Sequence, residues 1–417
     1  MQSERFSIGL TAAVAVLAMT VFLGNARAAT EKQLHNFKTD GKDGNNPNAG
    51  LIFDRAGNLY GTTYDGGAHG GGTVFELTPK KGGGWRETIL HNFNPHIKDG
   101  SYPLAGVIFD ASGNLYGTTS VGGLYQQGTV FELTPKAGGG WTETILHSFS
   151  NGGRDGAGPA ASLIFDAAGN LYGTTQEGGD SSCGAVFELK PHAGGGWGEE
   201  ILHRFSLDGK DGCTPLAHLI FDEAGNLYGT TKAGGFFRAG TVFELMPKAG
   251  GGWTEKRLEF FNSSGRYGYN PVASLIFDAV GNLYGTTETG GHAKYKGGHG
   301  TVFSLTPAVH GVWAENVLHW FNENNGGAPV AALIFDSLGN LYGTTSQGGD
   351  HLAGTVFKLA PQTGGGWTGK ILHEFNNNGK DGSNPSAGLI LDSDGNLYGT
   401  TADGGAFGAG TVFEITP

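Results

Sequence analysis

The sequence predicts an all-β fold, a seven-bladed β-propeller with four antiparallel strands in each blade. One phrase, G-N-L-Y-G-T-T, recurs at a spacing of 56 residues, with a single spacing of 58. Each copy holds four short runs of strand-forming residues, and the two ends of the chain carry complementary parts of one copy. A fixed period of about this length is typical of solenoids and propellers. The seven copies of the phrase begin at Gly57, Gly113, Gly169, Gly225, Gly281, Gly339 and Gly395.

The first 28 residues are expected to form a signal peptide. Arg5 precedes an apolar run over residues 8–23, and an A-x-A site follows at residues 26–28. The run is short and is interrupted by polar residues, so we favour cleavage near Ala28 over a membrane anchor. We therefore expect export, to the extracellular space or the periplasm, without stable membrane insertion.

The four strands expected in each copy are short. In the second copy they cover residues 104–110, 115–119, 129–134 and 141–149. Turns of the types Asp-x-x-Gly-Asn, Gly-Gly and Pro-x-x-Gly-Gly-Gly separate them, and Gly and Asn supply the positive φ that tight hairpins need. Because the 78 glycines return at fixed offsets, they indicate turns rather than disorder.

The two ends of the chain favour a closed ring over a parallel β-helix. Residues 413–417 match the third strand of a copy, and residues 33–37 match the fourth strand. Pairing of these two segments would complete the last blade and would leave no free sheet edge. We expect residues 29–417 to form this single domain.

The balance of charge excludes one class of partner. The chain has 26 basic and 38 acidic residues, which gives a net charge of -12. Phosphate backbones require a broad positive surface, so we expect no nucleic-acid partner. The sequence leaves the oligomeric state open.

Two longer phrases of the repeat resemble a known family. L-I-F-D-x-x-G-N-L-Y-G-T-T followed by G-T-V-F-E-L-T-P is similar to the tandem repeat of the choice-of-anchor GloVer-repeat proteins. The resemblance covers essentially all of the chain after the expected signal peptide. It implies a bacterial, exported repeat protein without an established activity, whose relatives can carry differing C-terminal surface anchors.

Polar residues that recur in most copies are expected to be structural. Five or six equivalent catalytic centres in one chain are not expected, so we interpret the recurring histidines as members of buried hydrogen bonds between strands, with the Thr or Trp of their own blade as candidate partners. We interpret the recurring Asp-Gly pairs as turns, and we expect no metal and no cofactor. The histidines are His35, His91, His147, His203, His319 and His373, and the aspartates are Asp43, Asp99, Asp155, Asp211 and Asp381.

Residues that break the repeat mark the candidate ligand site. Most of them lie on one face, where the loops between second and third strands meet the connections between copies. The fifth copy has the longest of these loops, and aromatic and cationic side chains near it suit stacking on a ligand and binding of acidic groups. A solvated loop is the other interpretation. The candidates are Phe236, Phe237, Arg238, Tyr267, His292, Lys294, Tyr295, Lys296 and His299.

The two cysteines of the chain, Cys183 and Cys213, both fall on this face. In an exported protein we expect them to form a disulfide. No C-x-x-C motif and no dedicated base indicate a redox or nucleophilic role for either.

The sequence predicts function only as a class. No catalytic residue can be assigned, since the G-x-S-x-G, H-E-x-x-H and P-loop motifs are absent. We favour a non-catalytic extracellular protein that binds a glycan or another protein. A secreted carbohydrate-active lyase or hydrolase, with His292 or His299 as acid or base, is the main alternative, and a structural envelope or matrix component is the third.

Overall fold

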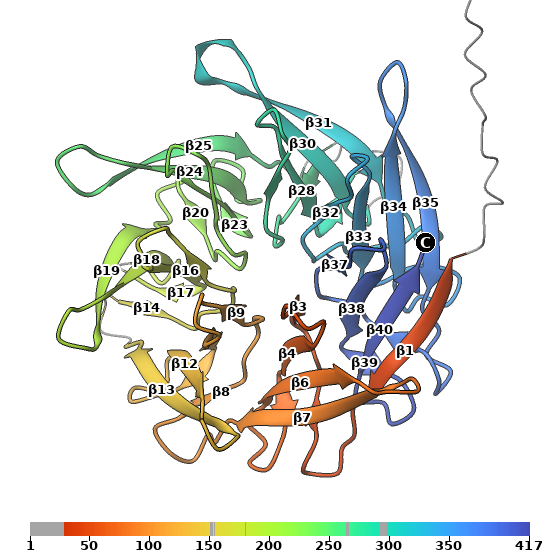
Figure 1. The fold of residues 1–417 in the computed structure, drawn as a ribbon. Helices are drawn as coiled ribbons and strands as arrows, with labels where there is room; N and C mark the ends of the chain where they lie inside the picture. The colour runs from red at the N-terminus through yellow and green to blue at the C-terminus, as the bar shows by residue number, and fades with distance from the viewer. Residues whose placement is uncertain (1–28, 151–152, 154, 180, 264–266, 292–297) are drawn as a thin grey trace, which may run out of the picture.

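The structure is a computed structural model in which seven four-stranded antiparallel sheets stand around a central axis as the blades of a propeller (Figure 1). The predicted fold class is confirmed. One 3-10 turn, η1 (Val309–Gly311), is the only helical segment in the described residues. The expected signal peptide, residues 1–28, lies outside them. The structure describes residues 29–150, 153, 155–179, 181–263, 267–291 and 298–417.

The two inner strands of each blade differ in length. We number the blades 1 to 7 from the copy that begins at Gly57. The first strands are β3 (Ile52–Phe53), β9 (Ile108–Phe109), β15 (Ile164–Phe165), β21 (Ile220–Phe221), β27 (Ile276–Phe277), β32 (Ile334–Phe335) and β37 (Ile390–Leu391). The second strands are β4 (Leu59–Thr63), β10 (Leu115–Thr119), β16 (Leu171–Thr175), β22 (Leu227–Thr231), β28 (Leu283–Thr287), β33 (Leu341–Thr345) and β38 (Leu397–Thr401).

The first strand is shorter than the sequence predicted. We expected residues 104–110 in blade 2, but only Ile108 and Phe109 pair with β10. Residues 104–107 instead line the central channel together with their counterparts in the other blades. A segment that faces the channel has no neighbouring strand on its inner side, so its backbone forms no ladder there.

The third and fourth strands of each blade are longer than the first two, and the fourth strand is the outer edge of the sheet. The third strands are β6 (Thr73–Pro79), β12 (Thr129–Pro135), β18 (Ala185–Pro191), β24 (Thr241–Pro247), β30 (Thr301–Pro307), β34 (Thr355–Pro361) and β40 (Thr411–Thr416). The fourth strands are β7 (Trp85–Asn92), β13 (Trp141–Ser148), β19 (Trp197–Arg204), β25 (Trp253–Phe260), β31 (Trp313–Trp320), β35 (Trp367–Glu374) and, in blade 7, β1 (Thr30–Asn36).

The seventh blade is built from both ends of the chain. β1 pairs antiparallel with β40, so that Thr30 lies opposite Thr416 and Asn36 opposite Thr411. The sheet order is β1-β40-β38-β37, and Figure 1 shows the first strand closing the ring beside the last. The predicted closure is confirmed.

Short ladders tie the connections between blades to the loops between second and third strands. These two classes of loop therefore share one face, as predicted, and we call it the variable face. In blade 6 a single bridge between Gly327 and Gln347 takes the place of the ladder. The ladders are β2 (Gly44–Asn45) with β5 (Asp65–Gly66), β8 (Gly100–Ser101) with β11 (Val121–Gly122), β14 (Gly156–Ala157) with β17 (Glu177–Gly178), β20 (Gly212–Cys213) with β23 (Ala233–Gly234), β26 (Gly268–Tyr269) with β29 (Thr289–Gly290), and β36 (Gly382–Ser383) with β39 (Asp403–Gly404).

The hydrophobic core lies between neighbouring blades. Phe93 at the end of blade 1 packs edge-on against Phe131 of blade 2, with ring centroids 5.1 Å apart, and both side chains are fully buried. Gly117 faces Phe131 within blade 2, where an added Cβ would lie 2.5 Å from the ring. Trp141 packs against the same cluster and is partly buried.

The Asp-x-x-Gly-Asn turns are structural, as predicted. In blade 2, Asp110 accepts backbone hydrogen bonds from Ser112 and Asn114 at 2.8 and 2.9 Å. Its second oxygen accepts from the Asn114 side chain. A carboxylate that is saturated by its own turn in this way is not free to bind a ligand.

Candidate functional site

An open cleft of about 840 Å³ lies on the outer side of blade 4. Its wall carries Phe236 and Phe237, from the loop between β23 and β24. Their rings meet edge to face at 90°, with centroids 5.0 Å apart, and remain 72% and 46% exposed. The other lining residues are Gly209, Lys210, Met246, Thr254, Glu255, Lys256, Arg257 and Phe260.

Cationic side chains share this cleft with the two rings. Arg257 is held by Glu255 at 2.5 Å, and Lys256 lies 3.4 Å from Glu244. The side chain of Lys210 forms no ion pair with any described residue, and its backbone N–H donates to Asp208. The cleft therefore combines an exposed aromatic pair with one cation that is free to meet an acidic group.

The structure gathers only part of the predicted ligand site. Phe236 and Phe237 lie in the cleft, whereas the neighbouring Arg238 is exposed but does not line it. Tyr267 is 48% exposed on the connection to blade 5 and is also outside the lining. The predictions for His292, Lys294, Tyr295 and Lys296 fall outside the described residues.

His299, the last of the predicted candidates, is half-buried rather than open to a ligand. Its ring lies against the connection to blade 6, where an added Cβ at Gly327 would be 3.2 Å from Nδ1. Its backbone oxygen accepts a hydrogen bond from Ala328.

Lys210, Lys256 and Arg257 were missed by the sequence analysis. A signal was present, because Arg257 stands where Ile89 and Ile145 stand in blades 1 and 2. The register of the third and fourth strands is the same in all three blades, so a charge replaces an apolar side chain at one position. This charged side chain, Arg257, lines the cleft.

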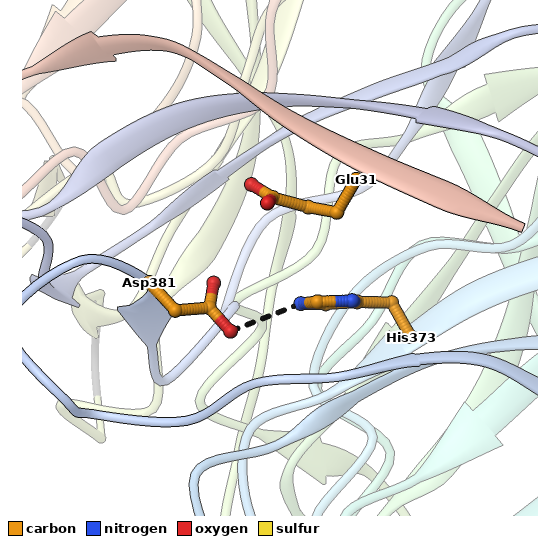
Figure 2. Close-up of side chains that lie close together, drawn as sticks. All are labelled: Glu31, His373 and Asp381. Atoms are coloured by element: carbon orange, nitrogen blue, oxygen red, sulfur yellow. Dashed lines mark hydrogen bonds and ion pairs between the residues drawn. The ribbon is translucent and has the colours of Figure 1, made fainter.

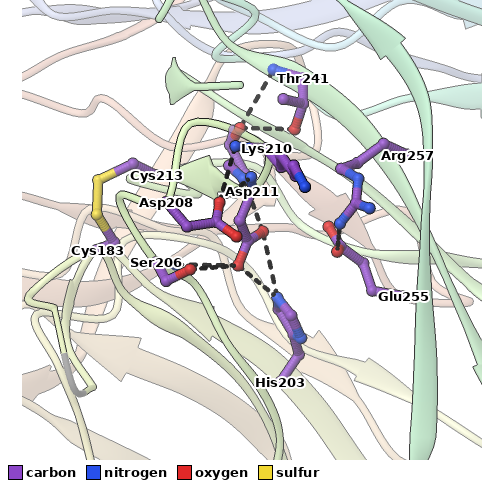
Figure 3. Close-up of polar contacts among 12 residues, drawn as sticks. Cys183, His203, Ser206, Asp208, Lys210, Asp211, Cys213, Thr241, Glu255 and Arg257 are labelled. Carbon is purple, nitrogen blue, oxygen red and sulfur yellow. Dashed lines mark hydrogen bonds and ion pairs between the residues drawn. A yellow bond between two sulfur atoms is a disulfide. The ribbon is translucent and has the colours of Figure 1, made fainter. Parts of the chain in front are cut away.

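The predicted disulfide is confirmed. Cys183 and Cys213 are bonded on the variable face, and both are buried (Figure 3). The bond joins the loop of blade 3 to the connection that leaves the same blade, and it lies near the polar residues beside the cleft.

A second arrangement recurs at five junctions between blades. Each junction brings together a His from the fourth strand of one blade, the Asp of the following Asp-Gly, and a Glu from the fourth strand of the next blade. Ligand atoms of the three residues lie within 4.8 Å of one another. The junction clusters are His35 with Asp43 and Glu87, His91 with Asp99 and Glu143, His147 with Asp155 and Glu199, His203 with Asp211 and Glu255, and His373 with Asp381 and Glu31.

A β-bulge directs each of these histidines. In blade 2, Val130 pairs with His147 but Phe131 pairs with Ile145, so Leu146 is an extra residue in β13. The same register shift occurs in all seven fourth strands. A bulge turns the following side chain away from the regular alternation. Because of the bulge, the imidazole lies beside the connection to the next blade.

Three clusters have both carboxylates close to the imidazole. The Nε2 atom of His147 lies 3.6 Å from Asp155 and 3.4 Å from Glu199. His35 is 3.6 Å from Asp43 and 3.5 Å from Glu87. The third cluster is tighter on one side, since His91 is 3.2 Å from Asp99 and 3.6 Å from Glu143.

In the other two clusters the glutamate stands apart from the imidazole. His373 bonds Asp381 at 3.1 Å, while Glu31 on β1 makes no bond to either (Figure 2). His203 also bonds its aspartate at 3.1 Å, and Glu255 is turned to Arg257 (Figure 3).

Burial and crowding shift the protonation of the clusters. Burial and the neighbouring Asp99 raise the pKa of Glu143 to about 9. Burial and Asp43 do the same to the pKa of Glu87, also to about 9. Burial acts to raise the pKa of Asp99 as well, but hydrogen bonds with His91 and Glu143 outweigh it and lower that pKa. Glu87 and Glu143 therefore hold protons at neutral pH in the absence of another cation.

The predicted partner of the histidines is wrong. Five of the six lie beside the Asp-Gly aspartate, and His35, His91 and His147 also contact the next blade's glutamate. The sixth, His319, contacts Asn325. The aspartates do shape their turns, because Asp99 also accepts from the backbone of Asn94 and Gly100. The glutamates were missed, although the phrase W-x-E in most copies marks them.

The central channel, of about 560 Å³, is lined mainly by small and aliphatic residues from all seven blades. Among the described residues that line it, His218 is the one with an ionisable side chain. Burial lowers the pKa of His218 to about 4, and its Nδ1 lies 2.7 Å from Ser274 Oγ. Ser274 is only 5% exposed, and its oxygen also accepts from the His218 backbone. The pair is thus engaged with itself rather than presented to a substrate.

The family described as the Gloeobacter/Verrucomicrobia repeat matches residues 19–151, 84–297 and 295–417. The chain belongs to this family. The resemblance inferred from the repeated phrases is thereby confirmed. No curated protein matches this Gloeobacter/Verrucomicrobia repeat protein.

Three solved structures similar to this Gloeobacter/Verrucomicrobia repeat protein carry the names of enzymes, two of them as assigned activities. One assigned as a 6-phosphogluconolactonase from Bacteroides uniformis is 14% identical, with a TM-score of 0.51 over 84% of this chain and 88% of that one. One assigned as an oxidoreductase (glucose dehydrogenase) from Thermus thermophilus is 15% identical, with a TM-score of 0.42 over 93% and 100%. A luciferin-regenerating enzyme is 14% identical, with a TM-score of 0.44 over 75% and 90%. At these identities the likeness shows the fold alone.

The described residues of the repeat protein include no helix with the length and hydrophobicity that a membrane span requires.

Proposed function

We propose that the chain is an exported, non-catalytic binding propeller and that its ligand is an acidic glycan held in the cleft of blade 4. The observation that carries the proposal is the exposed edge-to-face pair of Phe236 and Phe237 in an open cleft lined by three cations. Aromatic rings that remain largely exposed to water lose the benefit of burial, so a pair of them beside a cleft favours a ligand that covers them.

The chemistry of the cleft fits a sugar that carries a negative charge. An aromatic face packs against the apolar C–H face of a sugar ring, and a polar rim fixes its orientation. Lys210 supplies a cation without an ion-pair partner among the described residues, which suits a carboxylate or sulfate group. The net charge of -12 over the chain would repel such a ligand elsewhere, so the local cations direct it to the cleft.

Export is part of the same proposal. The expected signal peptide, cleaved near Ala28, supports it, and so does the disulfide between Cys183 and Cys213. Disulfides persist in oxidising compartments outside the cytoplasm.

The test is binding of defined oligosaccharides to the chain from residue 29 onward. We expect uronic-acid or sulfated oligosaccharides to raise the melting temperature and neutral ones to raise it less, since a ligand of the folded state stabilises it by mass action. The double variant Phe236→Ala/Phe237→Ala should weaken binding at least tenfold. Phe407→Ala is the matched control, because Phe407 is 53% exposed at the position of Phe237 in blade 7.

Other results would favour the alternatives. Shortened products from a polysaccharide would support a lyase or hydrolase instead of a binding protein. If Phe407→Ala lost as much affinity as the double variant, the result would contradict a site specific to blade 4. Absence of any glycan binding would leave a protein partner or a structural role in the envelope or matrix.

A further inference from the structure

We propose that three junction clusters are binding sites for a divalent metal ion of the zinc type, each holding two neighbouring blades together. They are the clusters of His35, His91 and His147, which lie between blades 7 and 1, 1 and 2, and 2 and 3. Each would offer one imidazole nitrogen and two carboxylate oxygens, with water as a further ligand.

The spacing of the donor atoms fits such an ion. Zinc binds nitrogen and oxygen ligands at about 2.0 to 2.2 Å in a tetrahedral arrangement, which places the ligands about 3.4 Å from one another. In the His147 cluster the imidazole nitrogen is 3.6 and 3.4 Å from the two carboxylate oxygens. In the His35 cluster the same distances are 3.6 and 3.5 Å. These separations exceed a normal hydrogen bond and match the edge of a coordination tetrahedron.

Unpartnered atoms in the same clusters point to a missing ligand. Nε2 of His147 and Oε1 of Glu199, which face each other, are both buried and have no hydrogen-bond partner. In the His35 cluster Nε2 is likewise without a partner, and Asp43, only 8% exposed, has an unpartnered Oδ1. Buried polar atoms are nearly always satisfied, so each exception needs an explanation. A metal ion satisfies the imidazole and the carboxylates of a cluster together.

Charge supports a cation at each of these places. A bound metal ion takes the place of the glutamate proton. With the imidazole neutral and both carboxylates ionised, a cluster carries two negative charges in a mostly buried setting, where uncompensated charge is costly. One divalent ion cancels both, and one proton cancels only one. The single nitrogen donor and the low ligand number favour zinc or another first-row divalent ion over calcium, which takes six to eight oxygens.

The four remaining junctions do not form the same site. Glu255 is bound by Arg257, and Glu31 makes no contact with His373 within ion-pair distance. Between blades 5 and 6, His319 contacts Asn325, and Gly369 stands where the glutamate would be. Between blades 4 and 5, Glu259 occupies the histidine position.

The test counts zinc ions in the chain from residue 29 onward, after removal of metal with a chelator. We expect three equivalents of Zn²⁺ to bind near neutral pH, as measured by equilibrium dialysis with elemental analysis. The triple variant His35→Asn/His91→Asn/His147→Asn should lose all three, and His91→Asn alone should lose one. His319→Asn is the matched control and should keep three, because its junction lacks both carboxylates.

A spectroscopic readout keeps the proposal testable if the triple variant does not fold. Co²⁺ in the unsubstituted protein should give the intense visible bands of a four-coordinate nitrogen and oxygen site, and Zn²⁺ should displace them. Less than one equivalent of Zn²⁺ would overturn the proposal. So would retention of three equivalents in a folded triple variant, which would place the ions on other histidines.

Discussion

Thr400 Oγ1 donates a hydrogen bond of 3.2 Å to the backbone oxygen of Ala49, 351 residues away in the sequence. Thr400 lies in β38 of blade 7, and Ala49 precedes the first strand of blade 1. Every other blade repeats the bond to its neighbour, for example from Thr62 to Ala105 at 2.9 Å. Side-chain hydrogen bonds thus join the inner strands of adjacent blades around the whole ring.

Replacing Thr400 with Val should destabilise the fold at the point of closure. The substitution keeps the shape of the side chain but leaves the buried Ala49 oxygen without its partner, which costs about 1–3 kcal/mol. Urea unfolding followed by tryptophan fluorescence measures the change. Thr142→Val, at an exposed position of β13, is the control and should change stability by less than about 0.5 kcal/mol. Equal effects of the two would mean that the bond contributes nothing.

Gly117→Ala should be strongly destabilising. An added Cβ would lie 2.5 Å from the Phe131 ring and 3.1 Å from Val107, so the core between blades 1 and 2 would have to shift. Overpacking of a core costs about 1–3 kcal/mol. Gly138→Ala is the control, because it has no atom within 4 Å, and it should be neutral or slightly stabilising. Calorimetric melting of both variants distinguishes the two cases, and a neutral Gly117→Ala would contradict the close packing.

Loss of the disulfide should lower stability without removing the fold. Cys183 and Cys213 are separated by 30 residues. On the chain-entropy account a closed loop of this length contributes about 3–4 kcal/mol. The double variant Cys183→Ser/Cys213→Ser should therefore unfold at lower urea concentration. A reducing agent should lower the midpoint of the native protein and leave that of the variant unchanged; an unchanged native midpoint after complete reduction would contradict the prediction.

Glu315 should make stability depend on alkaline pH. Burial and then the neighbouring Glu259 raise the pKa of Glu315 from 4.5 to about 8. A carboxyl with a raised pKa in the folded state favours folding while it is protonated. Its contribution is complete below pH 4.5 and is lost as the pH rises through about 8. Chelated wild-type protein should therefore weaken between pH 5 and pH 9 relative to Glu315→Gln, on the order of 2–4 kcal/mol. Urea midpoints at several pH values measure this difference, and parallel pH profiles would refute it.

Most of the architecture could be predicted because it depends on repetition. The turn Asp110, the packing Trp141 and the closing strand β1 each recur or complement a recurring segment, so the period alone places them. The length of the first strand was overestimated. An apolar run such as residues 104–110 has the same sequence pattern whether its residues pair in a sheet or line a channel.

The candidate sites were harder to predict because they depend on contacts between copies. The cleft joins Lys210 of one copy to Phe237 and Arg257 of the next, and no spacing in the sequence expresses that proximity. The junction clusters combine three recurring residues that look structural when each is considered alone. Only the bulge before each histidine and the blade arrangement bring His147 to Glu199.

The pairing of the two chain ends in blade 7 allows such a ring to change in size by whole copies. In blades 1 to 6 one continuous segment of the chain supplies all four strands. Blade 7 takes three strands from the C-terminal end of the chain and its outer strand, β1, from the N-terminal end. Deleting or duplicating one whole copy of 56 residues would leave those ends complementary. The number of blades is therefore set by packing between neighbours, such as Tyr116 of blade 2 against Trp197 of blade 3, 6.2 Å apart. The pairing of β1 with β40 does not depend on the number of blades. A ring of this kind can therefore gain or lose a blade by recombination between copies, and the same two strands still close it.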